Sequence, residues 1–100
     1  MITDIDFVQL EKLQQQGADL IDVREDDEVA EGMIDGARHL ALSDLPEVLA
    51  TIAQNKPTVF YCRSGRRSMK AAQLVENYAK CPIYNLTGGY LAYLEYKQNT

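Results

Sequence analysis

The chain has 100 residues, of which 46% are hydrophobic and 25% are charged, with six glycines and three prolines. This composition is typical of a folded globular protein and excludes a disordered or fibrous chain. The net charge of −5 argues against broad nucleic-acid binding, because contact with a phosphate backbone requires a basic surface. Without repeats or linker-like stretches, residues 1–100 are expected to form one domain.

The sequence also disfavours membrane segments and metal sites. No apolar run approaches the ~20 residues that span a bilayer, and the N-terminus lacks the basic start and apolar stretch of a secretory signal. We therefore expect a cytoplasmic protein with no membrane partner. The two cysteines, Cys62 and Cys81, are too few for a disulfide framework, and a single histidine leaves too few ligands for a structural zinc site. Each cysteine is then expected to be either reactive or packed in the core.

The first predicted helix begins close to the N-terminus. Asp6 and Gln9 have the spacing of a capping box, in which two side chains accept backbone N–H groups in the first turn. Gly17 suits the position just after the helix, because glycine tolerates the left-handed backbone found there. Three apolar residues at helical spacing form the expected buried face: Phe7, Leu10 and Leu13.

Extended segments follow at intervals along the chain. Four of them are predicted, over residues 20–23, 38–40, 58–61 and 83–86. The segment at 58–61, Thr-Val-Phe-Tyr, does not alternate with polar residues, which is typical of a parallel strand buried on both faces. Because helical patterns separate these segments, the sequence predicts a three-layer α/β domain around a mainly parallel sheet of about five short strands.

Two helical segments are predicted between the first and the third of these extended segments. Residues 25–31 are acidic and predict a short helix or turn that ends at Gly32. Ser43 can cap the next helix, and Pro46 is tolerated in its first turn. Apolar residues then recur at helical spacing as far as Ile52, which predicts a helix over most of this stretch.

The second half of the chain contains two more predicted helices. One covers residues 68–80, and the other begins at Gly89. The side chains expected to face the core from the first of these helices are Ala71, Ala72, Leu74, Val75 and Tyr78.

The loop over residues 62–67 carries the strongest functional signal, because open α/β sheets bind ligands beyond the carboxyl ends of their strands. Three of the ten basic residues follow Cys62 within five positions: Arg63, Arg66 and Arg67. A cysteine at the end of an apolar strand is often only a small buried hydrophobe. Here the helix N-terminus and the guanidinium groups favour its thiolate, while Ser64 and Gly65 let the backbone curl around a ligand. We therefore predict that Cys62 is a nucleophile beside a site for a small anion.

At this loop the chain resembles a known family. Cys-Arg-Ser-Gly-Arg-Arg-Ser after Val-Phe-Tyr is similar to the active-site loop of rhodanese-like sulfurtransferases. Three other segments resemble that family's markers in the expected order: residues 20–25, then Glu28 with residues 32–37, and finally residues 85–89. The resemblance therefore extends over most of the chain, and it implies a rhodanese-like domain over residues 1–100.

The resemblance also implies a reaction. The Cys62 thiolate would take the outer sulfur of thiosulfate or a similar anionic donor, sulfite would leave, and the Cys62 persulfide would pass its sulfur to a thiol, cyanide or protein-thiol acceptor. Neither a cofactor nor a metal is expected. The residues expected to bind the donor and the persulfide are Arg63, Ser64, Gly65, Arg66, Arg67 and Ser68. Asp22 and Arg24 are expected to support the loop through hydrogen bonds or an ion pair.

Two alternatives stay open at this point. A cysteine phosphatase or arsenate reductase also places a cysteine at the head of an anion-binding loop, but the phosphatase signature requires an arginine six positions later. That position is Ser68, and Arg67 comes one residue early. The other alternative is a regulatory or sulfur-relay rhodanese module that acts on a protein partner. His39 is expected to be structural, and Cys81 is expected to pack rather than take a redox role.

Overall fold

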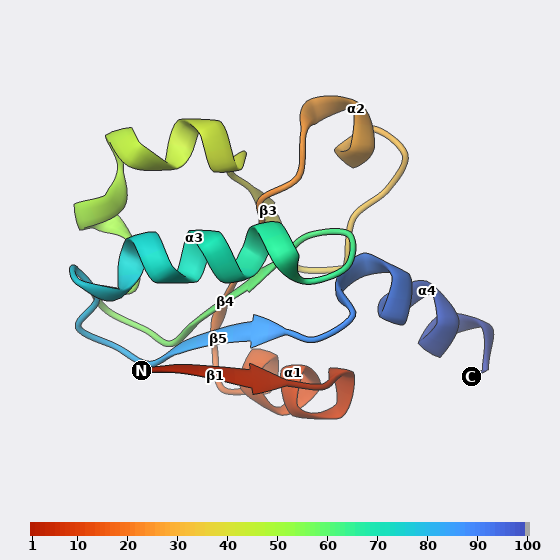
Figure 1. Ribbon diagram of the computed structural model, residues 1–100. Helices are drawn as coiled ribbons and strands as arrows, with labels where there is room; N and C mark the ends of the chain where they lie inside the picture. Colours follow the sequence, from red (N-terminus) through yellow and green to blue (C-terminus); the bar gives the residue numbers. More distant parts are fainter. Residues whose placement is uncertain (100) are drawn as a thin grey trace.

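A five-stranded sheet with the strand order β1-β5-β4-β2-β3 forms the centre of the computed structural model, which describes residues 1–99 (Figure 1). All four neighbouring pairs of strands are parallel. The strands are β1 (Ile2–Ile5), β2 (Asp19–Asp22), β3 (Arg38–His39), β4 (Thr58–Tyr61) and β5 (Ile83–Leu86). The helices are α1 (Phe7–Gln15), α2 (Asp26–Val29), α3 (Arg66–Glu76) and α4 (Gly89–Gln98), with the 3-10 helices η1 (Leu42–Glu47) and η2 (Leu49–Thr51).

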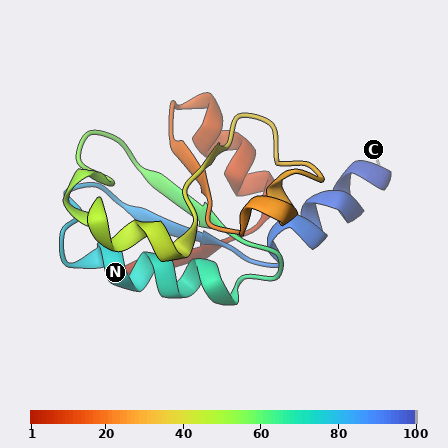
Figure 2. The ribbon, with the colours of Figure 1, turned by 90° about the horizontal axis from the view of Figure 1, so that it is seen from above.

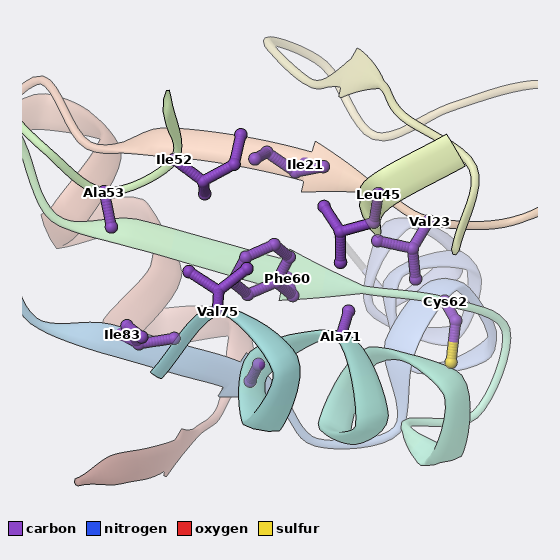
Figure 3. Close-up of a cluster of buried hydrophobic side chains, with 11 residues drawn as sticks. Ile21, Val23, Leu45, Ile52, Ala53, Phe60, Cys62, Ala71, Val75 and Ile83 are labelled. Carbon is purple, nitrogen blue, oxygen red and sulfur yellow. The ribbon is translucent and has the colours of Figure 1, made fainter. Parts of the chain in front are cut away.

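Helices cover both faces of this sheet, so the predicted three-layer α/β architecture is confirmed. Figure 2 shows α1 and α3 on opposite sides of the sheet. Along β4, Phe60 packs into the cluster shared with α3, η1 and η2 (Figure 3). Val59 and Tyr61 pack into the cluster shared with α1 and α4. All three side chains are fully buried, and each contributes roughly 1.5–3 kcal/mol to stability. The central strand is thus buried on both faces, as its unbroken apolar run predicts.

The first helix follows the prediction closely. The N–H of Gln9 donates to Asp6 Oδ1 and the N–H of Asp6 donates to Gln9 Oε1, each at 2.9 Å, which completes the capping box. After the helix, Gly17 has φ +90°, and its N–H donates to the carbonyl of Gln14. The N–H of Ala18 donates to the carbonyl of Leu13, so the helix ends in a Schellman motif.

The α-helix predicted from Ser43 to Ile52 is wrong. The chain forms η1 and η2 instead, and its backbone bonds join residues three apart, as from Val48 N–H to the Leu45 carbonyl. Ser43 is not the cap, because η1 begins one residue earlier and its first flanking residue, Ala41, makes no side-chain cap bond. Pro46 lies inside η1 and has no N–H to donate, which weakens regular helical pairing there.

The predicted boundaries of α3 are also partly wrong. The helix begins at Arg66 and ends at Glu76, four residues before the predicted end, because the N–H groups of Lys80 and Cys81 donate to the carbonyl of Ala53. Its buried stripe is Ser68, Ala71, Ala72 and Val75. Leu74 lies off this stripe and Tyr78 lies beyond the helix, so they are 40% and 50% exposed rather than buried.

One strand was not predicted. β1 pairs only with β5, at the edge of the sheet, and of its four residues only Ile5 is fully buried. Its Ile-Thr-Asp-Ile sequence is too short and too exposed to give a strong strand pattern. Within residues 1–99, no helix is long and apolar enough to cross a bilayer.

Candidate active site

Cys62 lies directly after β4, at the carboxyl end of the parallel sheet. Figure 3 shows its sulfur directed toward the first turn of α3. Gly65 is the residue before α3, and its φ of +111° lets the chain turn from the strand into the helix over the four residues 62–65. The side chain of Cys62 is only 1% exposed, so its sulfur is enclosed by the loop.

The sulfur of Cys62 receives hydrogen bonds from the start of α3. The N–H of Gly65 donates to Sγ at 3.1 Å and the N–H of Ser68 donates at 3.4 Å. The hydroxyl of Ser68 lies 3.5 Å from Sγ, where either atom could donate. Burial raises the pKa of the Cys62 thiol, but the hydrogen bonds from the Ser68 hydroxyl and from the N–H groups of Ser68, Gly65 and Ser64 outweigh it. The pKa of Cys62 therefore lies below the ordinary thiol value, and the thiolate is favoured.

Backbone N–H groups in the first turn of α4 donate hydrogen bonds to the loop that carries Cys62. The N–H of Tyr90 donates to the Cys62 carbonyl at 2.8 Å, and the N–H of Leu91 donates to the Arg63 carbonyl at 3.1 Å. Gly89 makes this approach possible, because its φ is +52° and a Cβ there would overlap the carbonyl oxygen of Cys62. The prediction that Gly89 opens the last helix is confirmed, and α4 binds the two successive peptide groups that follow Cys62.

The three arginines of the loop take different positions. Arg67 makes a two-pronged ion pair with Glu28 of α2, with nitrogen-to-oxygen distances of 2.6 and 2.8 Å. This pair lowers the pKa of Glu28 to about 2 and raises the pKa of Arg67. Arg63 and Arg66 are exposed and line hollows of about 210 and 470 Å³ respectively. The loop therefore keeps two arginines open to solvent, while the third is bound by a carboxylate of the chain itself.

Asp22, the last residue of β2, and Arg24 form the expected ion pair. Both side chains are buried, and the Arg24 guanidinium donates to Asp22 Oδ2 at 2.7 Å. The same guanidinium donates to the carbonyl of Gly32 at 2.6 Å and stacks on the ring of Tyr90 at 4.3 Å. Since the N–H of Tyr90 binds the Cys62 carbonyl, the pair is linked to the loop through α4.

Two residues at the site were not predicted to act there. Asn85 lies in β5, and its Oδ1 accepts a hydrogen bond of 2.6 Å from the Ser68 hydroxyl. Glu28 forms the ion pair with Arg67. Asn85 is the polar residue in the strand sequence Ile-Tyr-Asn-Leu, and that is the signal that could have identified it. In the structure it is only 5% exposed and is hydrogen-bonded, as buried polar groups are. The pairing of Glu28 gives no such signal, because it joins residues 39 positions apart.

His39 and Cys81 lie outside this arrangement. His39 Nε2 is 2.6 Å from the carbonyl oxygen of Arg24. Cys81 precedes β5, whereas Cys62 follows β4, so the parallel register separates them along the sheet by roughly 20 Å at ~3.3 Å per residue. Cys81 therefore cannot form a disulfide with Cys62 in this fold. Within the described residues 1–99, no three His, Cys, Asp or Glu side chains lie together as a metal ion would require.

Known proteins resemble this chain in both sequence and fold. A family model described as "Rhodanese-like domain" matches residues 7–96. A putative sulfurtransferase of Bacillus subtilis, YtwF, is 46% identical over 74 residues, which cover 74% of this chain and 71% of YtwF. A sulfurtransferase of Allochromatium vinosum is 35% identical, over 93% of this chain and 89% of its own.

A solved structure gives the same result for the fold. The human single-domain sulfurtransferase TSTD1 superposes with a TM-score of 0.81 at 29% identity, over 92% of this chain and 95% of TSTD1. Two further matches are to longer proteins, since this chain spans 58% of Bacillus subtilis YqhL and 16% of Bacillus anthracis CoADR-RHD. With the family model covering residues 7–96, the chain belongs to the rhodanese-like domain family.

Proposed function

We propose that this chain is a sulfurtransferase, in which Cys62 carries a sulfur atom as a persulfide between an anionic donor and a thiophilic acceptor. The observation that carries the proposal is the set of hydrogen-bond donors around Cys62 Sγ at the N-terminus of α3. Backbone N–H groups are fixed dipoles, so they stabilise a negative sulfur without having to reorganise during the reaction. The names of the similar sulfurtransferases are consistent with this chemistry.

The reaction has two displacement steps. In the first, the Cys62 thiolate attacks the outer sulfur of thiosulfate or a similar sulfane donor; a bond forms between the two sulfurs as the sulfur–sulfur bond of thiosulfate breaks, and sulfite leaves with the electron pair. In the second, a thiol, cyanide or protein thiolate attacks the outer sulfur of the persulfide, and the Cys62 thiolate leaves. No external oxidant or reductant is needed, because the cysteine returns to its starting state.

In this proposal, the residues of the loop have different roles in binding the donor and the persulfide. Arg63 and Arg66 are exposed and attract the anionic end of the donor. Arg67 is bound by Glu28, so its guanidinium acts on the sulfur only through its charge and is not free to bind the donor. The N–H groups of residues 64–68 hold the persulfide anion, with Gly65 allowing the backbone to curl around it. Asp22 and Arg24 keep their supporting role.

The test is to treat the purified chain with thiosulfate and analyse it by mass spectrometry. We expect a mass increase of one sulfur atom on the peptide that contains Cys62, release of sulfite, and loss of the added sulfur when cyanide or a thiol is supplied. Comparing cyanide, small thiols and thiol proteins as acceptors separates a free enzyme from a sulfur-relay module. Hydrolysis of an aryl phosphate that depends on Cys62, with no persulfide from any sulfane donor, would overturn the proposal in favour of a cysteine phosphatase.

A further inference from the structure

The hydroxyl of Ser68 lies between two acceptors. Its oxygen is 2.6 Å from Asn85 Oδ1 and 3.5 Å from Cys62 Sγ, and the side chain of Ser68 is completely buried. A serine hydroxyl has one hydrogen to donate. It therefore cannot donate to the amide oxygen of Asn85 and to the sulfur of Cys62 at the same time.

The orientation of the Asn85 amide follows from its other contacts. Its Nδ2 lies 3.1 Å from Asp4 Oδ1 in β1 and 3.5 Å from the carbonyl oxygen of Gly65. Both of these atoms only accept hydrogen bonds, so the NH2 group must face them. The oxygen of the amide is then left to face Ser68, and it acts there as an acceptor.

We propose that Asn85 is a positioning residue that competes with the sulfur of Cys62 for the hydroxyl hydrogen of Ser68. While Cys62 is a thiol, its S–H donates to Ser68 Oγ and the Ser68 hydroxyl donates to Asn85. When the thiol proton leaves to water, the hydroxyl turns to the negative sulfur, and Asn85 Oδ1 loses its donor. The inference deepens the proposed function and rests on it in one respect, namely that the thiolate is the reactive form of Cys62.

This competition has a chemical use. A thiolate that is stabilised more strongly is present in a larger fraction, but it is also a weaker nucleophile. Because Asn85 Oδ1 competes for the hydrogen of the Ser68 hydroxyl, it limits the stabilisation that α3 gives to the sulfur. The side chain of Asn85 thus sets the balance between the amount of thiolate and its reactivity, although it does not contact the sulfur.

Several charged groups also lie on the elements around the Cys62 loop, and one of them, Arg67, interacts electrostatically with the sulfur. They are Arg63, Arg66 and Arg67 of the loop and α3, Glu28 of α2, the Asp22 and Arg24 pair at the end of β2, and Asp4 of β1. An effect of Asn85 must therefore be separated from theirs. Measuring it with and without the Ser68 hydroxyl does so, because the charges are the same in both backgrounds.

The experiment follows the ionisation of Cys62 by pH-dependent alkylation and by the ultraviolet absorbance of the thiolate, in protein that carries Cys81→Ser. Asn85→Leu removes the competing acceptor at similar size, so we expect the pKa of Cys62 to fall by about half a unit to one unit, the worth of one hydrogen bond. In the Ser68→Ala background, the same substitution is expected to leave the pKa unchanged. Thr87→Val, which removes a hydroxyl from the hollow beside Asn85, is the matched control and is expected to have no effect.

An unchanged pKa in Asn85→Leu, or an equal fall with and without the Ser68 hydroxyl, would overturn the inference. If Asn85→Leu does not fold, Asn85→Asp gives a second test: its charged acceptor should raise the pKa of Cys62, and raise it more when Ser68 is present. An equal rise in both backgrounds would also overturn it. The readout does not involve sulfur transfer, so failure of the proposed function shows separately, as an absence of sulfur uptake from thiosulfate.

Discussion

The two cysteines lie beyond opposite ends of the same helix. Cys62 precedes the N-terminus of α3, and the N–H groups of Gly65 and Ser68 donate to its sulfur. Cys81 follows the C-terminus of α3, where its own N–H donates to the carbonyl of Ala53; among residues 1–99, no hydrogen bond reaches its sulfur. A helix leaves unpaired N–H groups at its start and unpaired carbonyls at its end.

The comparison shows that position along the chain, rather than residue type, gives one thiol the hydrogen-bond donors that favour its thiolate. In a parallel sheet, the step from strand to helix occurs at the carboxyl end, so helix N-termini gather there. The step from helix back to strand occurs at the amino end, where the chain before β5 binds other backbone groups. We therefore expect the two ends of the sheet to respond very differently to substitution.

The largest difference is expected between the cysteines themselves. Cys62→Ser should abolish sulfur uptake from thiosulfate, because the oxygen of serine is not ionised near neutral pH and cannot form a persulfide. Cys81→Ser should retain nearly all of it. Sulfite release and the mass of each variant after treatment give the measurement. Persistent uptake in Cys62→Ser, or added sulfur on Cys81, would show that the comparison is wrong.

The next largest effect is expected on stability, from replacing one glycine at each end of the sheet. Gly89→Ala should destabilise the fold by about 3 kcal/mol, because the new Cβ overlaps the Cys62 carbonyl in addition to the strain of a positive φ. Gly17→Ala, at the amino end of β2, meets no atom within 4 Å and should cost only about 1 kcal/mol. Urea unfolding of both variants measures these values. Equal losses would mean that contact between α4 and the loop is unimportant.

The pKa of Cys62 tests whether the start of α3 stabilises the thiolate. In Cys81→Ser protein, alkylation of Cys62 should titrate with an inflection below the ~8.5 of a free thiol, because the hydrogen bonds at the start of α3 outweigh burial. The same protein unfolded in urea should titrate at the ordinary value, which provides the control. An inflection of the folded protein at or above that of the unfolded chain would mean that burial dominates.

The smallest expected effect concerns the ion pair between Glu28 and Arg67, at the carboxyl end of the sheet. The pKa of Glu28 is lowered to about 2, so its stabilising contribution is complete above its ordinary value of 4.5 and is lost as the pH falls toward 2. Because both side chains are partly exposed, Glu28→Gln should lower the free energy of unfolding at pH 7 by only about 0.5–1 kcal/mol.

Urea unfolding over this pH range tests the ion pair. The difference between wild type and Glu28→Gln should shrink as the solution is acidified. Glu31→Gln is the matched control, because Glu31 lines the same hollow and its side chain has no ion pair within residues 1–99. A Glu28→Gln difference that does not depend on pH would show that the Arg67 pair contributes nothing through charge.

Local patterns made much of this molecule predictable. The unbroken run over residues 58–61 identified the central strand, and the polar loop behind it identified the position of Cys62. The capping box of α1 and the glycine after it were readable because their hydrogen bonds join residues close in sequence. Where the physical cause of a structure lies within a few residues, the sequence predicts it well.

Other features depend on contacts between distant segments. The predicted helix after Ser43 became η1 and η2, and α3 ended early because Ala53 accepts the N–H groups that follow it. β1 exists because it pairs with β5 at the far end of the chain. In the site, the partners of Arg67 and Ser68 come from α2 and β5, which no pattern within the loop indicates.

The bonds from α4 to the loop also bear on how the protein is made. The carbonyls of Cys62 and Arg63 accept N–H groups from Tyr90 and Leu91, which are synthesised after them. At 5–20 residues per second, the ribosome needs a few seconds to add that intervening stretch. During this interval the loop around Cys62 in the nascent chain lacks its hydrogen bonds from α4. We therefore expect a chain stalled before α4 to bury and ionise this thiol less well than the released protein, so sulfur uptake should begin only after the last helix has emerged.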